Sequence, residues 1–172
     1  MKLLKFCKTL LMNFNVQLLR YPSVDISNRM KLLKAHKINR ILDIGANRGN
    51  YGLELRKHGY TGKIFSFESL SNLYELLEKK CKNNDMWTAY NFAIGDSDTK
   101  MEINIAGNTD SSSLLGMLPI HEISTPQSRY IGKEKIEARR LDTVYNNLCN
   151  ESDKVYLKID TQGFEKNVLD RA

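Results

Sequence analysis

The sequence has few cysteines and no long apolar run. Its three cysteines, Cys7, Cys81 and Cys149, lie far apart in the 172-residue chain and show no metal-ligand spacing. This pattern argues against a disulfide framework and fits a reducing compartment, so we expect a cytoplasmic protein. No apolar stretch is long enough to span a bilayer. Internal repeats and low-complexity segments are also missing, which favours one ordinary globular domain.

The excess of positive charge is small. Lys and Arg number 26 against 20 Asp and Glu, which gives a net charge of +6, and the basic residues are spread along the chain. Such a surplus suits an anionic ligand or surface. It forms no concentrated basic segment, so nucleic acid is not expected as a partner.

Residues 1–37 are predicted to be a helical segment with a break near Pro22. The opening stretch, MKLLKFCKTLLMNF, carries Lys5 and Lys8 within its apolar part and has no small-residue cleavage site, so it does not fit a signal peptide. Its pattern is typical of an amphipathic helix. We expect this helix to pack on the domain, with peripheral contact to a membrane surface as the alternative.

From Ile38 onward, predicted strands and helices alternate. This order predicts an α/β domain over residues 38–172, with a mostly parallel sheet and right-handed crossovers. The chain stops soon after its last predicted strand, so we expect a fragment or natural truncation that lacks the C-terminal strands of the domain. The expected strands are residues 40–44, 63–68, 87–95, 99–106 and 154–160, the expected helices are 51–59, 70–84 and 164–172, and 135–148 is a strand running into a helix.

A strand that ends in an acid and a glycine-rich turn opens this domain. In ILDIGANRGNYG the apolar run reaches Asp43 and then passes into Gly45 and Gly49. The spacing is not the G-x-G-x-x-G of dinucleotide-binding folds. An acid at the strand tip instead suits a ligand with a positive group, such as S-adenosylmethionine, and Gly45 lets the backbone approach that ligand closely. A plain tight turn is the alternative.

The next two strand ends carry acids as well. Glu68 can accept both hydroxyls of an adenosine ribose, or it is an acid near a helix N-terminus. Asp96, which follows the segment NFAIG, can accept the adenine amino group, or it forms a turn. Ala93 and Ile94 in the same segment can pack on the adenine ring.

A further acidic segment is LKIDTQGFE. It places Asp160 at the carboxyl end of a strand, facing the crevice where open α/β sheets bind ligands. Glu165 opens the next helix, either as a functional carboxylate or as a helix N-terminal acid. The two carboxylates suit a methionine ammonium, an acceptor hydroxyl or a divalent metal. A metal is kept as an alternative and is not predicted.

The long loop before residue 133 contains His121 and three consecutive serines, Ser111, Ser112 and Ser113. A long loop in a compact domain is usually functional or disordered. We expect it to cover the cofactor, with His121 as a candidate catalytic group or an exposed histidine. The serines either bind the carboxylate of the cofactor or form a turn.

Together these segments resemble the FkbM family of S-adenosylmethionine-dependent methyltransferases, in the family's order and over residues 38–172. The resemblance implies a class I methyltransferase fold, which is a Rossmann-like three-layer sandwich, and O-methylation of a sugar, glycan or related natural product. The sequence departs from the family at Ser69, where Pro is common, and at Arg171, where Gly is common. The segments that carry the resemblance are ILDIGANRGNYGLELRKHGYTGKIFSFES, NFAIGD, SSSLL, RRLDTV and LKIDTQGFEKNVLDRA.

The resemblance also implies roles for single residues. Asp160, with Gly163 and Glu165, matches the family's D-x-x-G-x-E segment. The matches to the cofactor site are Asp43, Gly45, Asn47 and Gly49 in the first loop, Glu68 as the ribose acid and Asp96 as the adenine-side acid.

The expected reaction is an in-line transfer of the sulfonium methyl to an acceptor oxygen, which requires close positioning and a base near the attacking hydroxyl. The candidate bases are Asp160, His121 and Glu165, with Asp160 best placed at the sheet edge. The alternatives are a truncated, non-catalytic remnant that binds the cofactor weakly or not at all, and a nucleotide-dependent oxidoreductase. The sequence indicates neither the acceptor nor the oligomeric state.

Overall fold

Four parallel strands form the central layer of the computed structural model, which describes residues 23–107 and 129–170. Their order is β3-β2-β1-β7. The predicted α/β class with a mostly parallel sheet is therefore confirmed. The strands are β1 (Arg40–Ile44), β2 (Lys63–Phe67), β3 (Trp87–Tyr90) and β7 (Val155–Ile159).

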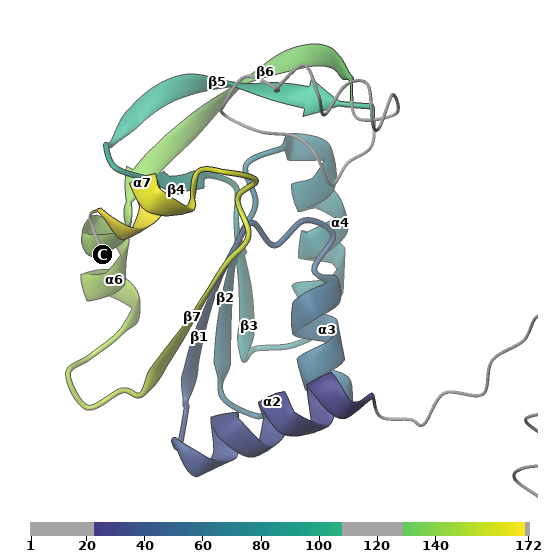
Figure 1. Ribbon diagram of the computed structural model, residues 1–172, viewed down its shortest axis with the longest axis vertical. Coiled ribbons are helices and arrows are strands. Elements are labelled where there is room, and N and C mark those ends of the chain that lie inside the picture. The colour runs from purple at the N-terminus through teal and green to yellow at the C-terminus, as the bar shows by residue number, and fades with distance from the viewer. Residues whose placement is uncertain (1–22, 108–128, 171–172) are drawn as a thin grey trace, which may run out of the picture.

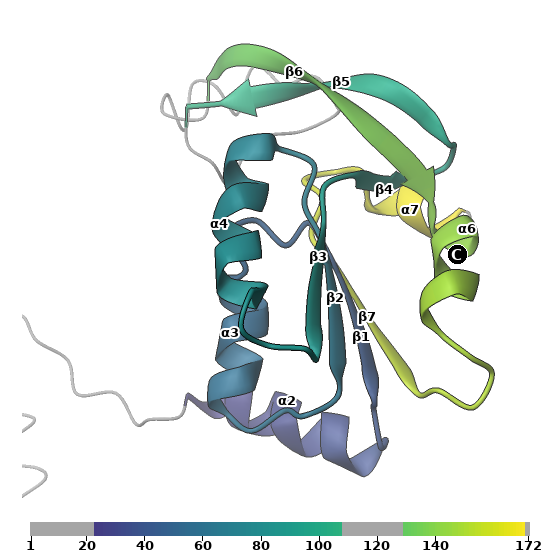
Figure 2. The same ribbon diagram turned by 180° about the vertical axis from the view of Figure 1, so that it is seen from behind.

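Helices cover both faces of this sheet, which gives three layers (Figures 1 and 2). On one face, α2 (Val24–Ala35), α3 (Asn50–Lys57) and α4 (Ser71–Cys81) cover the sheet. On the other face lie α6 (Leu141–Leu148) and the short α7 (Glu165–Leu169).

The parallel sheet has a hydrophobic core on each face, and the alternation of side-chain direction along its strands explains both. In β1, Ile41 packs with Leu55 and Leu77 under the α2–α3–α4 layer, while Leu42 packs with Val144 under α6. Neighbouring residues of a strand point to opposite faces, so one buried strand supplies both cores.

Helix α4 buries a narrower face than the sequence suggested. Leu73 and Leu77 are buried, as is Leu70 just before the helix. The leucine spacing of residues 70–77 predicts Leu76 on the same face, but it is 41% exposed. Its position lies about 100° around the helix from Leu77, so it points away from the sheet.

The segment 87–95 was predicted as one strand, and this was wrong. It forms β3 in the parallel sheet and β4 (Ala93–Gly95) in a second sheet with the order β4-β6-β5. The break falls at Asn91, whose side-chain amide donates to the backbone oxygens of Glu68 and Ser69 at 3.0 and 3.1 Å. These bonds hold the chain out of the extended path that β3 would otherwise continue.

The second sheet lies across the carboxyl ends of the parallel strands (Figure 1). It contains β5 (Thr99–Ala106) and the long β6 (Tyr130–Arg140), which pair antiparallel, and β4, which runs parallel to β6. Ile103 and Ile136 bury its lower side against Leu73 of α4. This sheet therefore roofs the edge at which a parallel α/β sheet binds its ligands.

The largely apolar composition of β7 predicts a buried strand, but all five of its residues are only half-buried. Within the described residues it pairs only with β1, so its other edge is open. The predicted helix at residues 1–20 lies outside the described residues. In the described ranges, no helix has the length and apolarity needed to cross a bilayer.

Candidate functional site

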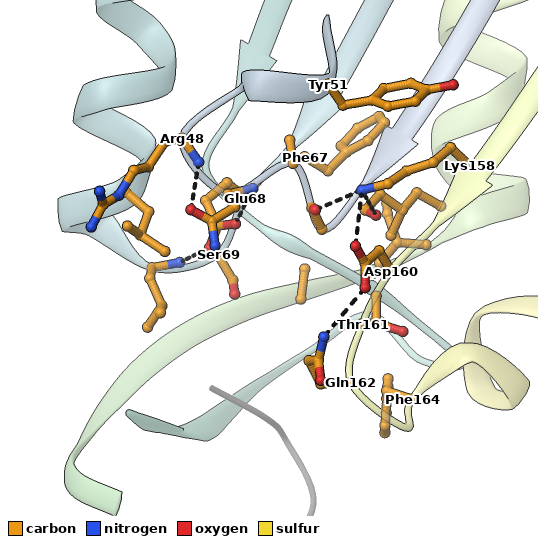
Figure 3. A pocket seen from close by; sticks show the side chains of 18 of the residues that line it. Arg48, Tyr51, Phe67, Glu68, Ser69, Lys158, Asp160, Thr161, Gln162 and Phe164 are labelled. Atoms are coloured by element: carbon orange, nitrogen blue, oxygen red, sulfur yellow. Dashed lines mark hydrogen bonds and ion pairs between the residues drawn. The ribbon is translucent and has the colours of Figure 1, made fainter. Parts of the chain in front are cut away.

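A cavity of about 440 Å³ lies where the carboxyl ends of β1, β2 and β7 meet the second sheet (Figure 3). This is large enough for a nucleotide-sized ligand. The residues that line it include Gly45, Ala46, Asn47 and Arg48 of the β1–α3 turn, Phe67, Glu68 and Leu70 after β2, Ala93, Ile94 and Ile103 of the second sheet, and Lys158, Asp160 and Phe164 around the end of β7.

The β1–α3 turn is pressed against the end of β7. Gly45 has φ +70°, and a Cβ atom there would overlap the carbonyl oxygen of Asp160. The turn is also tied to β2, because the N–H groups of Gly45 and Ala46 both donate to the Phe67 oxygen, at 3.1 and 2.9 Å. The absence of a side chain at Gly45 thus lets the turn pack directly against the end of β7.

Glu68 connects this turn to helix α4 at the cavity wall. Its Oε2 accepts from the N–H of Asn47 at 2.8 Å, and its Oε1 accepts from the N–H of Leu70 at 2.9 Å. Burial raises the pKa of Glu68, while these N–H groups act in the opposite direction. A carboxylate held by two backbone donors keeps free lone pairs for ligand hydroxyls.

Asp43 lies behind the cavity and does not line it. It is fully buried, and a positive group of the chain itself faces it: Lys158 Nζ lies 3.0 Å from Oδ1. The hydroxyl of Ser66 donates to Oδ2 at 3.1 Å. Burial raises the pKa of Asp43, and Lys158 and Ser66 oppose that shift. Asp43 therefore supports the cavity wall from inside.

Lys158 is a charged residue of this wall that could not be recognised from the sequence pattern alone. It lies directly opposite Asp43 in the β1–β7 register and lines the cavity. The available signal was a single lysine inside an otherwise apolar strand. Such a lysine needs a buried acidic partner, and the strand register supplies one.

Asp160 reaches the cavity from the end of β7 (Figure 3). Its side chain is 59% exposed, its Oδ2 lies 3.8 Å from Lys158 Nζ, and its Oδ1 accepts from Gln162 Nε2 at 3.3 Å. An exposed carboxylate at this position is able to accept a proton or face a cation.

Two other predicted acids lie outside the cavity lining. Glu165 accepts from the N–H groups of Thr161 and Gly163 at 3.2 and 3.1 Å. Burial acts to raise the pKa of Glu165, but the N–H donors outweigh it and the pKa is lowered. Asp96 accepts from Asn167 Nδ2 at 2.8 Å. Both acids connect loops to α7.

The remaining predicted residues have three different outcomes. Ala93 and Ile94 line the cavity, while Gly49 lies just before α3 as its N-cap, with φ +72°. His121 lies outside the described residues, as do the three serines at 111–113. Within the described ranges, no group of three or more His, Cys, Asp or Glu side chains could hold a metal ion.

A parallel sheet with a glycine turn at the end of β1 and a ligand-sized cavity at its carboxyl edge defines a Rossmann-like α/β fold with a candidate ligand site. The model of the methyltransferase FkbM domain matches residues 43–172, more than half of the chain. The chain therefore belongs to the FkbM methyltransferase family, and it is an S-adenosylmethionine-dependent methyltransferase with an acceptor substrate. Comparisons with curated proteins and with solved structures gave no significant match.

Proposed function

We propose that the cavity binds S-adenosylmethionine next to a hydroxylated acceptor, and that the enzyme O-methylates a sugar, glycan or related small molecule. The observation that carries this proposal is the meeting of the Gly45 turn, Glu68 and Asp160 around one cavity. The proposed methyltransferase unit is residues 38–172. A cytoplasmic location is supported by the free, buried thiols of Cys81 and Cys149.

The residues present fit the cofactor. Gly45 lines the cavity with backbone alone, and Glu68 is a buried carboxylate with lone pairs for the two ribose hydroxyls. Ala93, Ile94 and Ile103 offer apolar surface for the adenine ring. When bound, the cofactor supplies an electrophilic methyl group.

The chain would contribute positioning and a base. Asp160 is the exposed carboxylate of the cavity, so we assign it to accept the proton of the acceptor hydroxyl. Glu165 is engaged by backbone N–H groups and is a weaker candidate for this role. The roof formed by the second sheet limits access of water to the same space.

The test is a methyl-transfer assay with labelled S-adenosylmethionine and a panel of hydroxylated acceptors. With saturating cofactor, Asp160→Asn should lower kcat by roughly 100-fold or more, the usual loss when a general base is removed. Asp170→Asn is the control, since Asp170 pairs with Lys166 outside the cavity. An unchanged kcat in the Asp160 variant would remove the assignment.

A further inference from the structure

Lys158 holds an ammonium group at the cavity wall, with its side chain only 17% exposed. Its Nζ donates to the carbonyl oxygen of Gly45 at 2.9 Å and forms the ion pair with Asp43 at 3.0 Å. The ring of Tyr51 lies over it, with its centroid 5.7 Å away. Figure 3 shows the ammonium between Tyr51 and Asp160.

A buried chain of polar groups fixes this ammonium from behind. Trp87 Nε1 donates to Ser66 Oγ at 3.0 Å, and Ser66 donates to the Asp43 carboxylate that pairs with Lys158. Trp87, Ser66 and Asp43 are each buried in the core. A side chain held in this way loses little further freedom when it binds a ligand, which favours affinity.

The ammonium has one weakly engaged N–H group that a ligand in the cavity can take over. Of its three N–H groups, one donates to the Gly45 oxygen, and the Asp43 carboxylate is the close ion-pair partner. The other contacts are long, at 3.4 Å to the Ile44 oxygen and 3.8 Å to Asp160. An anionic ligand oxygen at normal hydrogen-bond distance would be a better partner than either.

The charges around Lys158 suit a zwitterion with an additional positive charge. Asp43, Lys158 and Asp160 together carry a formal charge of −1, with the cation between the two carboxylates. The amino-acid end of S-adenosylmethionine carries a carboxylate, an ammonium and a sulfonium, a formal charge of +1. The protein charges are therefore opposite in net sign to those of the ligand, and the lysine can face the ligand carboxylate while Asp160 faces its positive groups.

We propose that Lys158 binds the carboxylate of the amino-acid end of S-adenosylmethionine. This inference rests on the proposed placement of the cofactor in the cavity. It orients the cofactor in the cavity, with the amino-acid end against β7 and the adenosine toward Glu68 and the second sheet.

The experiment is calorimetric titration with two adenosine thioethers that differ only in the carboxylate, S-adenosylhomocysteine and its decarboxylated analogue. Lys158→Met should weaken binding of S-adenosylhomocysteine at least tenfold and change binding of the analogue by less than twofold. Lys154→Met, outside the cavity, should change neither. Lys158→Arg keeps the cation and should retain most of the difference between the two ligands.

A second variant keeps the test decisive if an unpaired Asp43 unfolds the chain. The double variant Asp43→Asn/Lys158→Met removes both buried charges, and it should show the same selective loss of S-adenosylhomocysteine binding. Equal losses of affinity for both ligands would mean that Lys158 only stabilises the cavity wall, and would overturn the inference. If the unmodified protein binds neither ligand, the proposed function itself is contradicted.

Discussion

Gly45 shows how one residue shapes the cavity. Its positive φ and its contact with the Asp160 backbone both exclude a side chain. Gly59 also has a positive φ, +89°, but a Cβ atom there would meet nothing within 4 Å. The two glycines therefore separate the cost of backbone strain from the cost of a clash.

We predict that Gly45→Ala destabilises the protein by about 3 kcal/mol or more, because strain and overlap add. Gly59→Ala should cost about 1 kcal/mol from strain alone. Urea unfolding of both variants measures the difference. Equal losses would mean that the turn does not press against β7 as described.

Single residues also differ in how far the sequence predicts their place in the site. Glu68 and Asp160 could be found because each follows a predicted strand, and both line the same cavity. The partner of Asp43 could not be read from local pattern, because it lies 115 positions later and is set by the β1–β7 register. Pairing between distant strands decides which acids face a ligand and which face the chain.

At the level of elements, the junction of β1 and β7 depends on Asp153. Its carboxylate accepts from the N–H of Asn150 at 2.9 Å, from Asn39 Nδ2 at 2.9 Å and from Arg40 Nε at 3.2 Å. The Asn150 N–H, together with Asn39 and Arg40, holds the pKa of Asp153 below its ordinary value of 3.8. The loop before β7 is thereby tied to the start of β1.

This lowered pKa predicts a pH-dependent contribution to stability. The contribution is fully present above the unfolded pKa of 3.8 and is lost as the pH falls through the lower folded value. The stability difference between the unmodified protein and Asp153→Asn should be constant above about pH 5 and shrink below 3.8. Urea midpoints from pH 7 to pH 3 measure it.

The control for this experiment is Glu102→Gln, which breaks an exposed ion pair with Lys133. We expect it to change stability by less than about 1 kcal/mol. A difference for Asp153→Asn that stays constant down to pH 3 would contradict the role given to this carboxylate.

Helix α4 offers a matched pair for its buried face. Leu77→Ala should cost about 2–5 kcal/mol, since the side chain is fully buried between the helix and the sheet. Leu76→Ala, one position earlier and 41% exposed, should cost less than about 1 kcal/mol. Chemical denaturation distinguishes them, and similar losses would mean that the helix faces the sheet differently.

Elements differ in how far local sequence predicts them. Strands β1 and β2 and helix α3 follow clear apolar patterns, and their positions were predicted to within a few residues. The division of residues 87–95 into β3 and β4 was not, because both pieces have strand-like composition. The break depends on Asn91 bonding to a distant turn, which is a tertiary contact.

For the whole molecule, the central feature is that segments distant in the sequence meet at one cavity. The β1–α3 turn, the end of β2, the second sheet and the end of β7 each supply part of its wall (Figure 3). The parallel topology explains how the parts from β1, β2 and β7 meet, because the carboxyl ends of these three strands lie at one edge. This part of the site could be predicted from element order alone.

The second sheet, in contrast, could not be predicted as a roof. Strand β5 was predicted at its observed residues and β6 only from residue 135, but nothing in their alternation indicated that they cross the carboxyl edge. That placement follows from Leu70, Leu73 and Ile103 burying one another between α4 and β5. The enclosed shape of the cavity is thus a property of the assembled molecule.

The most direct test of the account is calorimetric titration of S-adenosylmethionine into the unmodified protein and into Glu68→Gln. The control is Glu134→Gln, since Glu134 is another carboxylate that accepts from a backbone N–H at the start of α4, that of Ser71, but it does not line the cavity. We predict saturable one-to-one binding that Glu68→Gln weakens at least tenfold, or about 1.4 kcal/mol, and that Glu134→Gln leaves within twofold. Equal affinity in all three folded proteins, or no binding to any of them, would contradict the assignment of this cavity to the cofactor.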